Sequence, residues 1–463
     1  MRSESACHSK KRNRYFQGLT GDYLSFLIPE GSRILSLGCG SGLQLKRFKP
    51  SYALGVDIDQ SSLAIARKQC PEFEFVVGDI EDCGLLSDIQ SRGPFDIVLL
   101  DDTLGFIDDI QRFLWNIRGL CNPETRLVSV YYSYLWEPLI WFCEKLGVKE
   151  KTFPTTWLKI ADVENFLNIS GFESVKKEWR ILCPFRFFGL GNLINRYIAT
   201  LPIIRKICIR HFVVARPVGE LSEVKTTVSV IIPCKNERGN VESAVTRLPK
   251  MGNSVQVVFV EGHSTDGTWE ELQRVKTAYP LLDIKIIQQR GKGKGDAVRD
   301  GFDEATGEIL VILDADLTVP PEDLSKFVYA ISSRQAEFVN GSRLVYGREE
   351  KAMRYLNLMA NHFFALMFTY LINQKLTDTL CGTKVLKRQD YERIAKGRSY
   401  FGDFDPFGDF DLIFGASKLN LKFLEIPIRY ASRKYGETQI SRFSHGLLLS
   451  KMVLFAFKKL KAF

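Results

Sequence analysis

The sequence predicts an α/β protein with two domains, each built on a mostly parallel β-sheet that helices cover on both faces. The chain has 463 residues, which exceeds the size of one typical hydrophobic core. Strand-like apolar segments alternate with helix-like segments in both halves of the chain. A polar stretch at 218–227 separates the halves as a linker, and they share no repeat, so two different domains are expected.

The first domain is expected over residues 1–217, where apolar segments predict seven strands. These strands are expected at 33–37, 53–57, 73–77, 96–100, 126–131, 173–180 and 210–215. Helices are expected in the gaps, for example at 60–69 and 110–120.

The second domain is expected over residues 228–463. Its apolar segments predict strands at 228–233, 255–260, 284–289 and 309–313. The segment 355–374 carries no charge, but three asparagines and a histidine interrupt it. A buried or interfacial helix is therefore expected there rather than a transmembrane one.

Composition narrows the classes of partner and compartment. The net charge of +9 suits an anionic substrate or membrane surface, although an ordinary solvated surface gives the same value. No nucleic-acid-binding motif accompanies the charge, so nucleic acid is not an expected partner. The ten cysteines form no CxxC pair, and the N-terminus has no secretory signal, so a cytoplasmic, reducing location without a zinc site is expected.

Glycines and aspartates follow four successive strands of the first domain. A turn after the first strand carries Gly38, Gly40 and Gly42, which let the backbone approach a ligand closely. Asp57 ends the second strand, where it could accept hydrogen bonds from ribose hydroxyls, and Asp79 follows the third. Glycine and aspartate favour ordinary turns as well, but four such turns in register favour a cofactor crevice.

The GxGxG turn, the acidic second strand and the segment GDIED resemble class I S-adenosylmethionine-dependent methyltransferases over about residues 12–217. Leu43 stands where a dinucleotide fingerprint needs its third glycine. The resemblance implies a Rossmann-like seven-stranded fold that binds S-adenosylmethionine. It implies that the three glycines face the methionine portion, that Asp57 binds ribose and that Asp79 binds the adenine amine. Ser36 replaces an acidic residue common in such families, which leaves open an inactive domain that only binds a ligand or partner.

Polar residues also follow the strands of the second domain. Asp314 and Asp316 come directly after the apolar run 309–313, in a pattern suited to a divalent cation on a diphosphate. Their neighbours on the same sheet edge are expected to contact a nucleotide: Pro233, Glu237, Glu261, Asp266 and Lys294.

The segments VSVIIPCKNE, EGHSTDGT, GKGKG and DAD occur in the order typical of family 2 glycosyltransferases, which this region resembles over about residues 227–445. It is most similar in style to polyprenyl-phosphate glycosyltransferases. The resemblance implies a GT-A fold, a nucleotide-sugar donor and Mg²⁺ or Mn²⁺ at Asp314 and Asp316. Glu261 replaces an aspartate of the usual pattern, which leaves the catalytic base open. The nucleotidyltransferase fold is disfavoured because PCKNE stands where that fold has a glycine-rich loop.

Four residues farther along the chain are candidates for catalysis. Arg343 offers a guanidinium for phosphate, and Asp409 and Asp411 offer carboxylates for a general base or, alternatively, a helix cap. Arg433 belongs to a basic segment resembling the loop that closes over the diphosphate in such enzymes. The C-terminal segment 446–463 is apolar and basic, which fits a helix on an anionic membrane face or one packed on the core.

Taken together, these resemblances imply a bifunctional transferase. One reaction is an inverting, metal-dependent sugar transfer to a polyprenyl-phosphate, lipid-linked or glycan acceptor, and the other is methyl transfer. The combination implies a role in cell-surface polysaccharide or glycolipid biosynthesis, with peripheral contact to the cytoplasmic face of the membrane. A soluble enzyme acting on a protein or free sugar is the open alternative.

Overall fold

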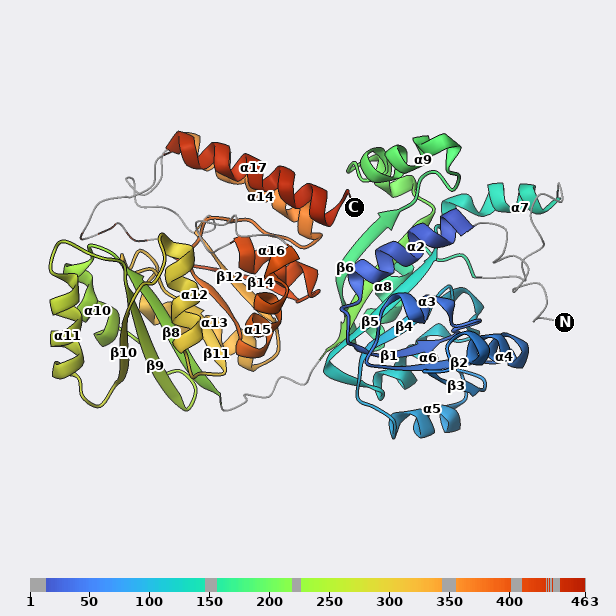
Figure 1. The fold of residues 1–463 in the computed structure, drawn as a ribbon, viewed down its shortest axis with the longest axis horizontal. Coiled ribbons are helices and arrows are strands. Elements are labelled where there is room, and N and C mark those ends of the chain that lie inside the picture. The colour runs from blue at the N-terminus through green and yellow to red at the C-terminus, as the bar shows by residue number, and fades with distance from the viewer. Residues whose placement is uncertain are drawn as a thin grey trace. The chain divides into compact units, whose positions relative to one another are not determined.

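The chain forms two compact units in a computed structural model. The structure describes residues 14–145, 156–218, 226–343, 355–400, 410–429, 431, 433, 435 and 442–462. The first unit comprises Met1–Val218 with Lys461–Phe463, and the second comprises Gly219–Leu460. The domain limits and linker expected from the sequence remain a prediction. Each unit is an α/β fold with a seven-stranded sheet (Figure 1).

The sheet of the first unit has the strand order β3-β2-β1-β4-β5-β7-β6, in which only the β7 pairings are antiparallel. All seven expected strands are present. Their bounds are β1 Arg33–Leu37, β2 Tyr52–Asp57, β3 Glu74–Val77, β4 Phe95–Asp101, β5 Cys121–Tyr132, β6 Phe172–Arg180 and β7 Arg210–Pro217. The order of the strands reverses between the parallel neighbours β1 and β4, and sheets of this kind bind ligands at such a point, at the carboxyl ends of the strands.

Helices connect the strands of this unit, and the expected helices at 60–69 and 110–120 are confirmed as α4 and α6. The helices are α2 Arg14–Leu27, α3 Leu43–Arg47, α4 Gln60–Gln69, α5 Cys83–Gln90, α6 Ile110–Arg118, α7 Glu137–Lys145, α8 Ile160–Ile169 and α9 Leu190–Leu193. The buried side chains of α6 recur at Ile110, Phe113, Leu114 and Ile117, the spacing of one helix face, and they join the core under β4 and β5.

The sheet of the second unit has the order β10-β9-β8-β11-β13-β12-β14. Its strands are β8 Thr227–Cys234, β9 Ser254–Glu261, β10 Asp283–Gln288, β11 Ile309–Ile312, β12 Phe338–Ser342, β13 Lys384–Lys387 and β14 Phe423–Pro427. The four predicted strands form its parallel half, and β13 pairs antiparallel with β11 and β12. The central strands β8 and β11 are almost fully buried because helices lie on both faces of the sheet (Figure 1), whereas the edge strand β10 is partly exposed.

The helices of this unit are α10 Val241–Thr246, α11 Thr268–Ala278, α12 Lys294–Glu304, α13 Leu324–Ser332, α14 Tyr355–Ile372, α15 Arg388–Lys396, α16 Phe410–Lys418 and α17 Arg442–Leu460. The helix expected at 355–374 is present as α14. In the last helix, α17, the side chains of Leu449, Met452, Ala456 and Leu460 are buried, which matches the expectation of a helix packed on the core. Of the helices in the described ranges, none combines the length and apolarity needed to cross a membrane.

Candidate functional site

A tight glycine turn follows β1 at the carboxyl edge of the first sheet. Gly38, Gly40 and Gly42 have φ values of 74°, 51° and 67°, which other residues rarely adopt. A Cβ on Gly38 would lie 2.8 Å from Thr103 Oγ1, and a Cβ on Gly42 would lie 2.9 Å from the Phe75 ring. Backbone conformation and packing therefore both require glycine here, and the turn presents bare backbone to a ligand.

Two carboxylates lie along the same edge. Asp57 Oδ2 accepts a hydrogen bond from the Gly40 amide at 2.6 Å, and Asp57 Oδ1 accepts one from the Asp59 amide at 2.9 Å. Asp79 is exposed after β3, and its Oδ1 accepts the Glu81 amide at 3.0 Å. The structure thus brings Asp57 against the glycine turn and places Asp79 one strand farther along the edge.

A buried arginine occupies the neighbouring part of this edge. Arg210 begins β7 and is 1 % exposed. Its guanidinium pairs with Asp101 at 3.2 Å and with Asp102, and it lies 4.5 Å from the centroid of the Tyr132 ring. Asp101 and Asp102 lie in the fourth of the glycine and aspartate turns expected from the sequence, but nothing in the sequence indicates their arginine partner, because only the fold brings β7 beside β5.

In the second unit, Asp314 and Asp316 follow β11 and both contact cationic side chains. Lys294 Nζ lies 2.6 Å from Asp314 Oδ1, and Arg433 Nη2 donates to Asp316 Oδ2 at 2.7 Å. Burial by itself would raise the pKa of Asp314, but nearby cations, Lys294 foremost and then Lys384 and Arg343, together lower the pKa below its usual range. Four residues predicted from separate sequence segments therefore meet at one edge of the sheet.

The strand end is ordered further by its neighbours. Asp316 Oδ1 accepts hydrogen bonds from the Thr318 amide at 3.1 Å and from its hydroxyl at 2.8 Å. Arg433 also reaches Glu237 Oε1 at 3.4 Å, and Asn240 Nδ2 donates to Glu237 Oε2 at 2.7 Å. Burial raises the pKa of Glu237, although the Asn240 hydrogen bond opposes this. The predicted residue Glu237 thus belongs to the same cluster as the two aspartates.

The carboxylates that follow β9 hold the loops of this edge. Glu261 is 1 % exposed and accepts the Ser264 amide at 2.5 Å. Asp266 Oδ2 accepts the Arg238 amide at 3.2 Å, which ties the loop after β9 to the loop after β8. Pro233 is half-buried near the end of β8. The structure thus gives Glu261 and Asp266 a loop-fixing role, and the nucleotide contacts of all three residues remain predictions.

Two family descriptions match the chain. Residues 35–129 match the family described as Methyltransferase domain, and residues 229–394 match Glycosyl transferase family 2. The chain joins a methyltransferase domain to a family 2 glycosyltransferase domain. The first match contains the glycine turn and Asp57, and the second contains Glu237, Lys294 and the two aspartates after β11.

Similar proteins cover parts of the chain. The dolichol-phosphate mannosyltransferase of Pyrococcus furiosus is 41% identical over 123 residues, which are 26% of this chain and 34% of the relative. The undecaprenyl-phosphate 4-deoxy-4-formamido-L-arabinose transferase of Proteus mirabilis is 24% identical over 218 residues, 46% of this chain and 63% of the relative. The chain thus spans less than two thirds of either relative. The solved S-adenosylmethionine dependent methyltransferase from Mesorhizobium loti has 18% identity and a TM-score of 0.32, covering 43% of this chain and 99% of that chain.

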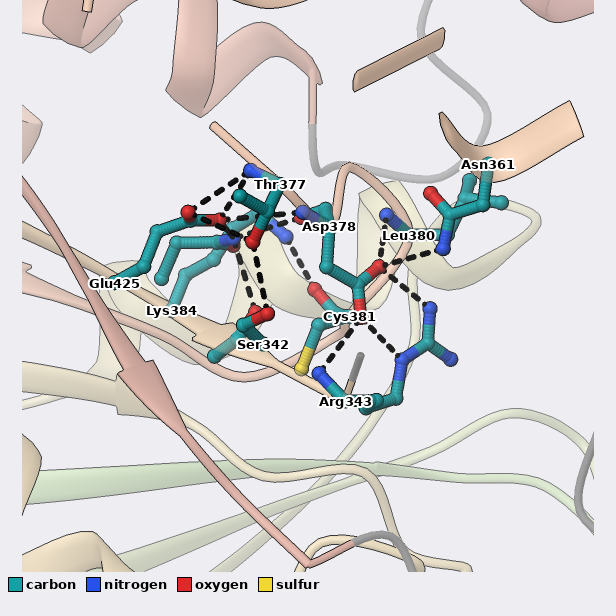
Figure 2. A network of polar contacts seen from close by, with 11 residues as sticks. Ser342, Arg343, Asn361, Thr377, Asp378, Leu380, Cys381, Lys384 and Glu425 are labelled. Atoms are coloured by element: carbon teal, nitrogen blue, oxygen red, sulfur yellow. Dashed lines mark hydrogen bonds and ion pairs between the residues drawn. The ribbon is translucent and has the colours of Figure 1, made fainter. Parts of the chain in front are cut away.

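Arg343 follows β12 and belongs to a buried polar network in the glycosyltransferase domain (Figure 2). Asp378, which is 0% exposed, accepts hydrogen bonds from Arg343 Nε at 2.7 Å, from its Nη2 at 2.8 Å and from its amide at 3.0 Å. The Leu380 amide and Asn361 Nδ2 also donate to this carboxylate, at 3.1 and 3.3 Å. Burial alone would raise the pKa of Asp378, but the Arg343 guanidinium lowers it. The predicted phosphate ligand Arg343 is therefore oriented by a buried carboxylate.

The segment that carries Asp378 is fixed from its other side by β14. Glu425 accepts the Thr377 amide at 2.8 Å and the Asp378 amide at 3.2 Å (Figure 2). A Cβ on Gly382 would lie 2.0 Å from Asp314 Oδ2, so this segment packs directly against the strand-end carboxylate. Sequence reasoning missed these contacts. The available signal was the polar run TDTLCGTK between an apolar helix and a strand.

The structure describes one of the two predicted candidates for a general base. Asp409 lies outside the described residues. Asp411, in the first turn of α16, is 8% exposed and pairs with Arg398 at 2.7 Å and Arg299 at 3.9 Å. These ion pairs give Asp411 a structural role that differs from the helix cap left open by the sequence. Its catalytic role remains a prediction.

Proposed function

We propose that the chain is a bifunctional transferase. Its glycosyltransferase domain transfers a sugar, with inversion, from a nucleotide sugar to a polyprenyl-phosphate, lipid-linked or glycan acceptor. Its methyltransferase domain transfers a methyl group from S-adenosylmethionine, and the products belong to cell-surface polysaccharide or glycolipid biosynthesis. The observation that carries the proposal is the meeting of Asp314, Asp316, Lys294 and Arg433 at the end of β11. The lipid phosphates in the names of the two transferase relatives support the acceptor class.

The strand-end carboxylates fit Mg²⁺ or Mn²⁺ shared with a substrate. Magnesium is usually held by one or two carboxylates together with phosphate oxygens, rather than by a cage made of protein ligands alone. Within the described ranges, no group of three or more acidic, histidine or cysteine side chains could hold a metal ion. Asp314 and Asp316 would therefore hold the ion jointly with the donor diphosphate. When bound, the ion would stabilise the negative charge of the departing nucleoside diphosphate.

The basic residues of the cluster would act on the donor phosphates. Lys294 begins α12 behind a glycine loop, and Arg433 lies across the site, so the two cations approach the aspartates from different segments. When the donor diphosphate enters, they can exchange the aspartate oxygens for phosphate oxygens. Arginine and lysine placed in this way neutralise charge that develops on a leaving group.

The acceptor decides whether a base is needed. A polyprenyl phosphate is already an anion, so it attacks the anomeric carbon without losing a proton, whereas a sugar hydroxyl requires a base. Asp411 already pairs with Arg398 and Arg299, so it is less available to take a proton from a sugar hydroxyl. This favours the phosphate acceptor, which needs no base. A lipid-linked acceptor also implies peripheral contact with the cytoplasmic face of the membrane.

The methyltransferase domain fits S-adenosylmethionine at the glycine turn. The Cβ atoms that Gly38 and Gly42 lack would collide with Thr103 and Phe75, so the bare turn is built into the packing. The turn and Asp57 would bind the cofactor, whose sulfonium supplies the methyl group. Ser36 is 3 % exposed within β1, and it provides no carboxylate for the cofactor amine. A domain that binds the cofactor or a partner without methyl transfer is therefore the second candidate.

The glycosyltransferase activity is tested by Asp316→Asn. Thermal shift with Mn²⁺ and a panel of nucleotide sugars identifies the donor, and release of nucleoside diphosphate in the presence of polyprenyl phosphate measures turnover. We expect kcat/KM to fall about 100-fold or more, the scale on which one preorganised electrostatic contact acts. Asp323→Asn is the matched control, because Asp323 lies seven residues beyond Asp316 and pairs with the exposed Lys326. Unchanged turnover of Asp316→Asn would refute the assignment.

The two candidates for the first domain are separated by binding and transfer measured on the same protein. Calorimetry should detect S-adenosylmethionine binding that Asp57→Ala weakens, with Asp96→Ala as a control on an aspartate that bonds the Arg33 amide. Labelled methyl groups should then appear in a glycan or lipid acceptor. Binding without transfer to any acceptor would favour the non-catalytic domain. Absence of S-adenosylmethionine binding would contradict the methyltransferase and would leave only a domain that binds a partner.

A further inference from the structure

The connection between β6 and β7 is an apolar and basic insertion in the methyltransferase domain. Residues 181–209 form short helical turns, among them α9. They connect the end of β6 to the start of β7, both of which lie at the carboxyl edge of the sheet. This insertion contains no aspartate or glutamate. Its charged residues are Arg186, Arg196, Arg205 and Lys206. A surface segment of this kind therefore combines exposed apolar side chains with positive charge alone.

The apolar side chains of the insertion point into solvent. Phe188 is fully exposed, Ile203 is 85% exposed, and Phe185, Phe187 and Leu190 are each more than half exposed. Phe187 and Phe188 have φ values of 41° and 51°, a region that bulky residues avoid. Holding two aromatic residues outward in such a conformation costs free energy, and this kind of strain is concentrated at functional positions.

A second exposed apolar segment adjoins the insertion. Leu135 and the α7 residues Leu139, Trp141 and Phe142 are each about half exposed. The two segments are joined by a hydrogen bond from Trp136 Nε1 to the Ile207 carbonyl at 2.9 Å. In Figure 1, α7 and α9 both lie on the side of the methyltransferase domain away from α5. We call the exposed apolar side chains of 135–142 and 185–207 the apolar edge.

The apolar edge borders the carboxyl end of the sheet that carries the cofactor crevice. Residues 135–142 follow β5, and residues 185–207 lead into Arg210, which pairs with Asp101 and Asp102 at the end of β4. A ligand bound at the apolar edge would therefore reach the methyltransferase site without crossing the sheet. Exposed apolar surface of this extent is uncommon on soluble proteins and marks an interaction site.

We propose that the apolar edge docks on an anionic membrane. Its aromatic and aliphatic side chains enter the boundary between headgroups and acyl chains, and Arg186 and Lys206 bind lipid phosphates. Charge decides the occupant. The insertion carries four basic residues and no acidic one, and residues 135–142 add one exposed acid, Glu137, so the apolar edge has a net positive charge. Such a surface is attracted to anionic lipid, whereas an apolar protein partner would not require that charge. The proposal is independent of both transferase activities.

The test is co-sedimentation of the full chain with vesicles in the absence of any donor or cofactor. We expect binding to vesicles containing phosphatidylglycerol and much weaker binding to phosphatidylcholine vesicles. Phe188→Asp combined with Ile203→Asp should reduce the partition about tenfold or more, because each change removes apolar burial. Arg186→Gln combined with Lys206→Gln should reduce it on the anionic vesicles, by about fivefold per residue.

Leu281→Asp is the matched control, since Leu281 is 98% exposed in the second unit and its replacement should leave binding unchanged. Leu454→Asp reports on α17, where Leu454 is 65% exposed. Loss of binding in Leu454→Asp but not in the Phe188/Ile203 variant would overturn the proposal. The proposal would also be overturned if the protein dimerised without vesicles and the Phe188/Ile203 variant abolished this dimerisation, because a second copy would then cover the apolar edge. Circular dichroism confirms that each variant is folded.

Discussion

The Arg343–Asp378 ion pair makes a quantitative prediction for the glycosyltransferase domain. Asp378→Asn keeps the shape of the side chain but removes the charge that balances a guanidinium only 13% exposed. Breaking a buried pair from one side costs about 3–5 kcal/mol, because the remaining charge stays buried without its partner. In a domain of this size about 1 kcal/mol lowers the melting temperature by about 2–4 °C, so we expect a fall of about 6–20 °C.

Scanning calorimetry of the full chain measures this shift. Val230 is buried in β8, so Val230→Ala should destabilise the glycosyltransferase domain. The unfolding transition that this variant shifts to lower temperature is therefore the transition of that domain. The matched control is Asp303→Asn, because Asp303 also pairs with an arginine, Arg290 at 3.1 Å, but its side chain is 56% exposed. A surface pair contributes about 0–1 kcal/mol, so the control should shift by about 4 °C or less. Equal, small shifts in both variants would refute the reasoning about the network.

Three further predictions address other parts of the chain. Burial, with a smaller effect from a neighbouring arginine, lowers the pKa of His211 from 6.5 to about 4. As the pH falls, His211 of the unfolded chain takes up a proton before His211 of the folded chain does. The free energy of unfolding should therefore fall by about 3 kcal/mol from pH 6.5 to pH 4, and His211→Phe should flatten this dependence when unfolding by urea is measured at each pH. Arg433→Gln removes a cation from Asp316 and should tighten Mn²⁺ binding to the donor-free protein about 2- to 10-fold by calorimetry. Gly382→Ala places a Cβ 2.0 Å from Asp314 Oδ2 and should weaken donor binding at least tenfold, with S-adenosylmethionine affinity unchanged.

The parallel strands could be predicted from the sequence because each is a short apolar run that ends in a turn residue. Strand β11, for example, reads ILVI and is followed closely by two aspartates. The strands β12, β13 and β14 escaped prediction because FVNGS, KVLK and FLEIP have no alternation of apolar and polar residues. Their extended conformation depends on pairing with one another and with β11, which only the assembled sheet provides.

The same distinction holds for the site. Asp57, Asp314 and Asp316 were predictable because they follow strands, and the carboxyl ends of parallel strands meet at one edge. Asp378 and Arg210 were not predictable, because nothing local distinguishes a buried ion-pair partner from the other charged residues of the chain. Their roles depend on contacts between segments that are 35 residues apart for Arg343–Asp378 and 108 apart for Arg210–Asp102.

The carboxylates at the carboxyl edges of both sheets already have partners within the protein. For Asp316, this couples the binding of the metal to the binding of the donor. A largely buried carboxylate is unfavourable without a partner, so Asp316, whose side chain is 14% exposed, keeps Arg433 until another cation replaces it. A divalent ion alone must displace that guanidinium into solvent, whereas a donor diphosphate offers the guanidinium a new anion. Metal and donor should therefore bind with positive coupling, each tightening the other by the same factor. The effect of Arg433→Gln on Mn²⁺ affinity without donor measures the internal competition directly, and loss of the coupling in that variant would assign it to Arg433.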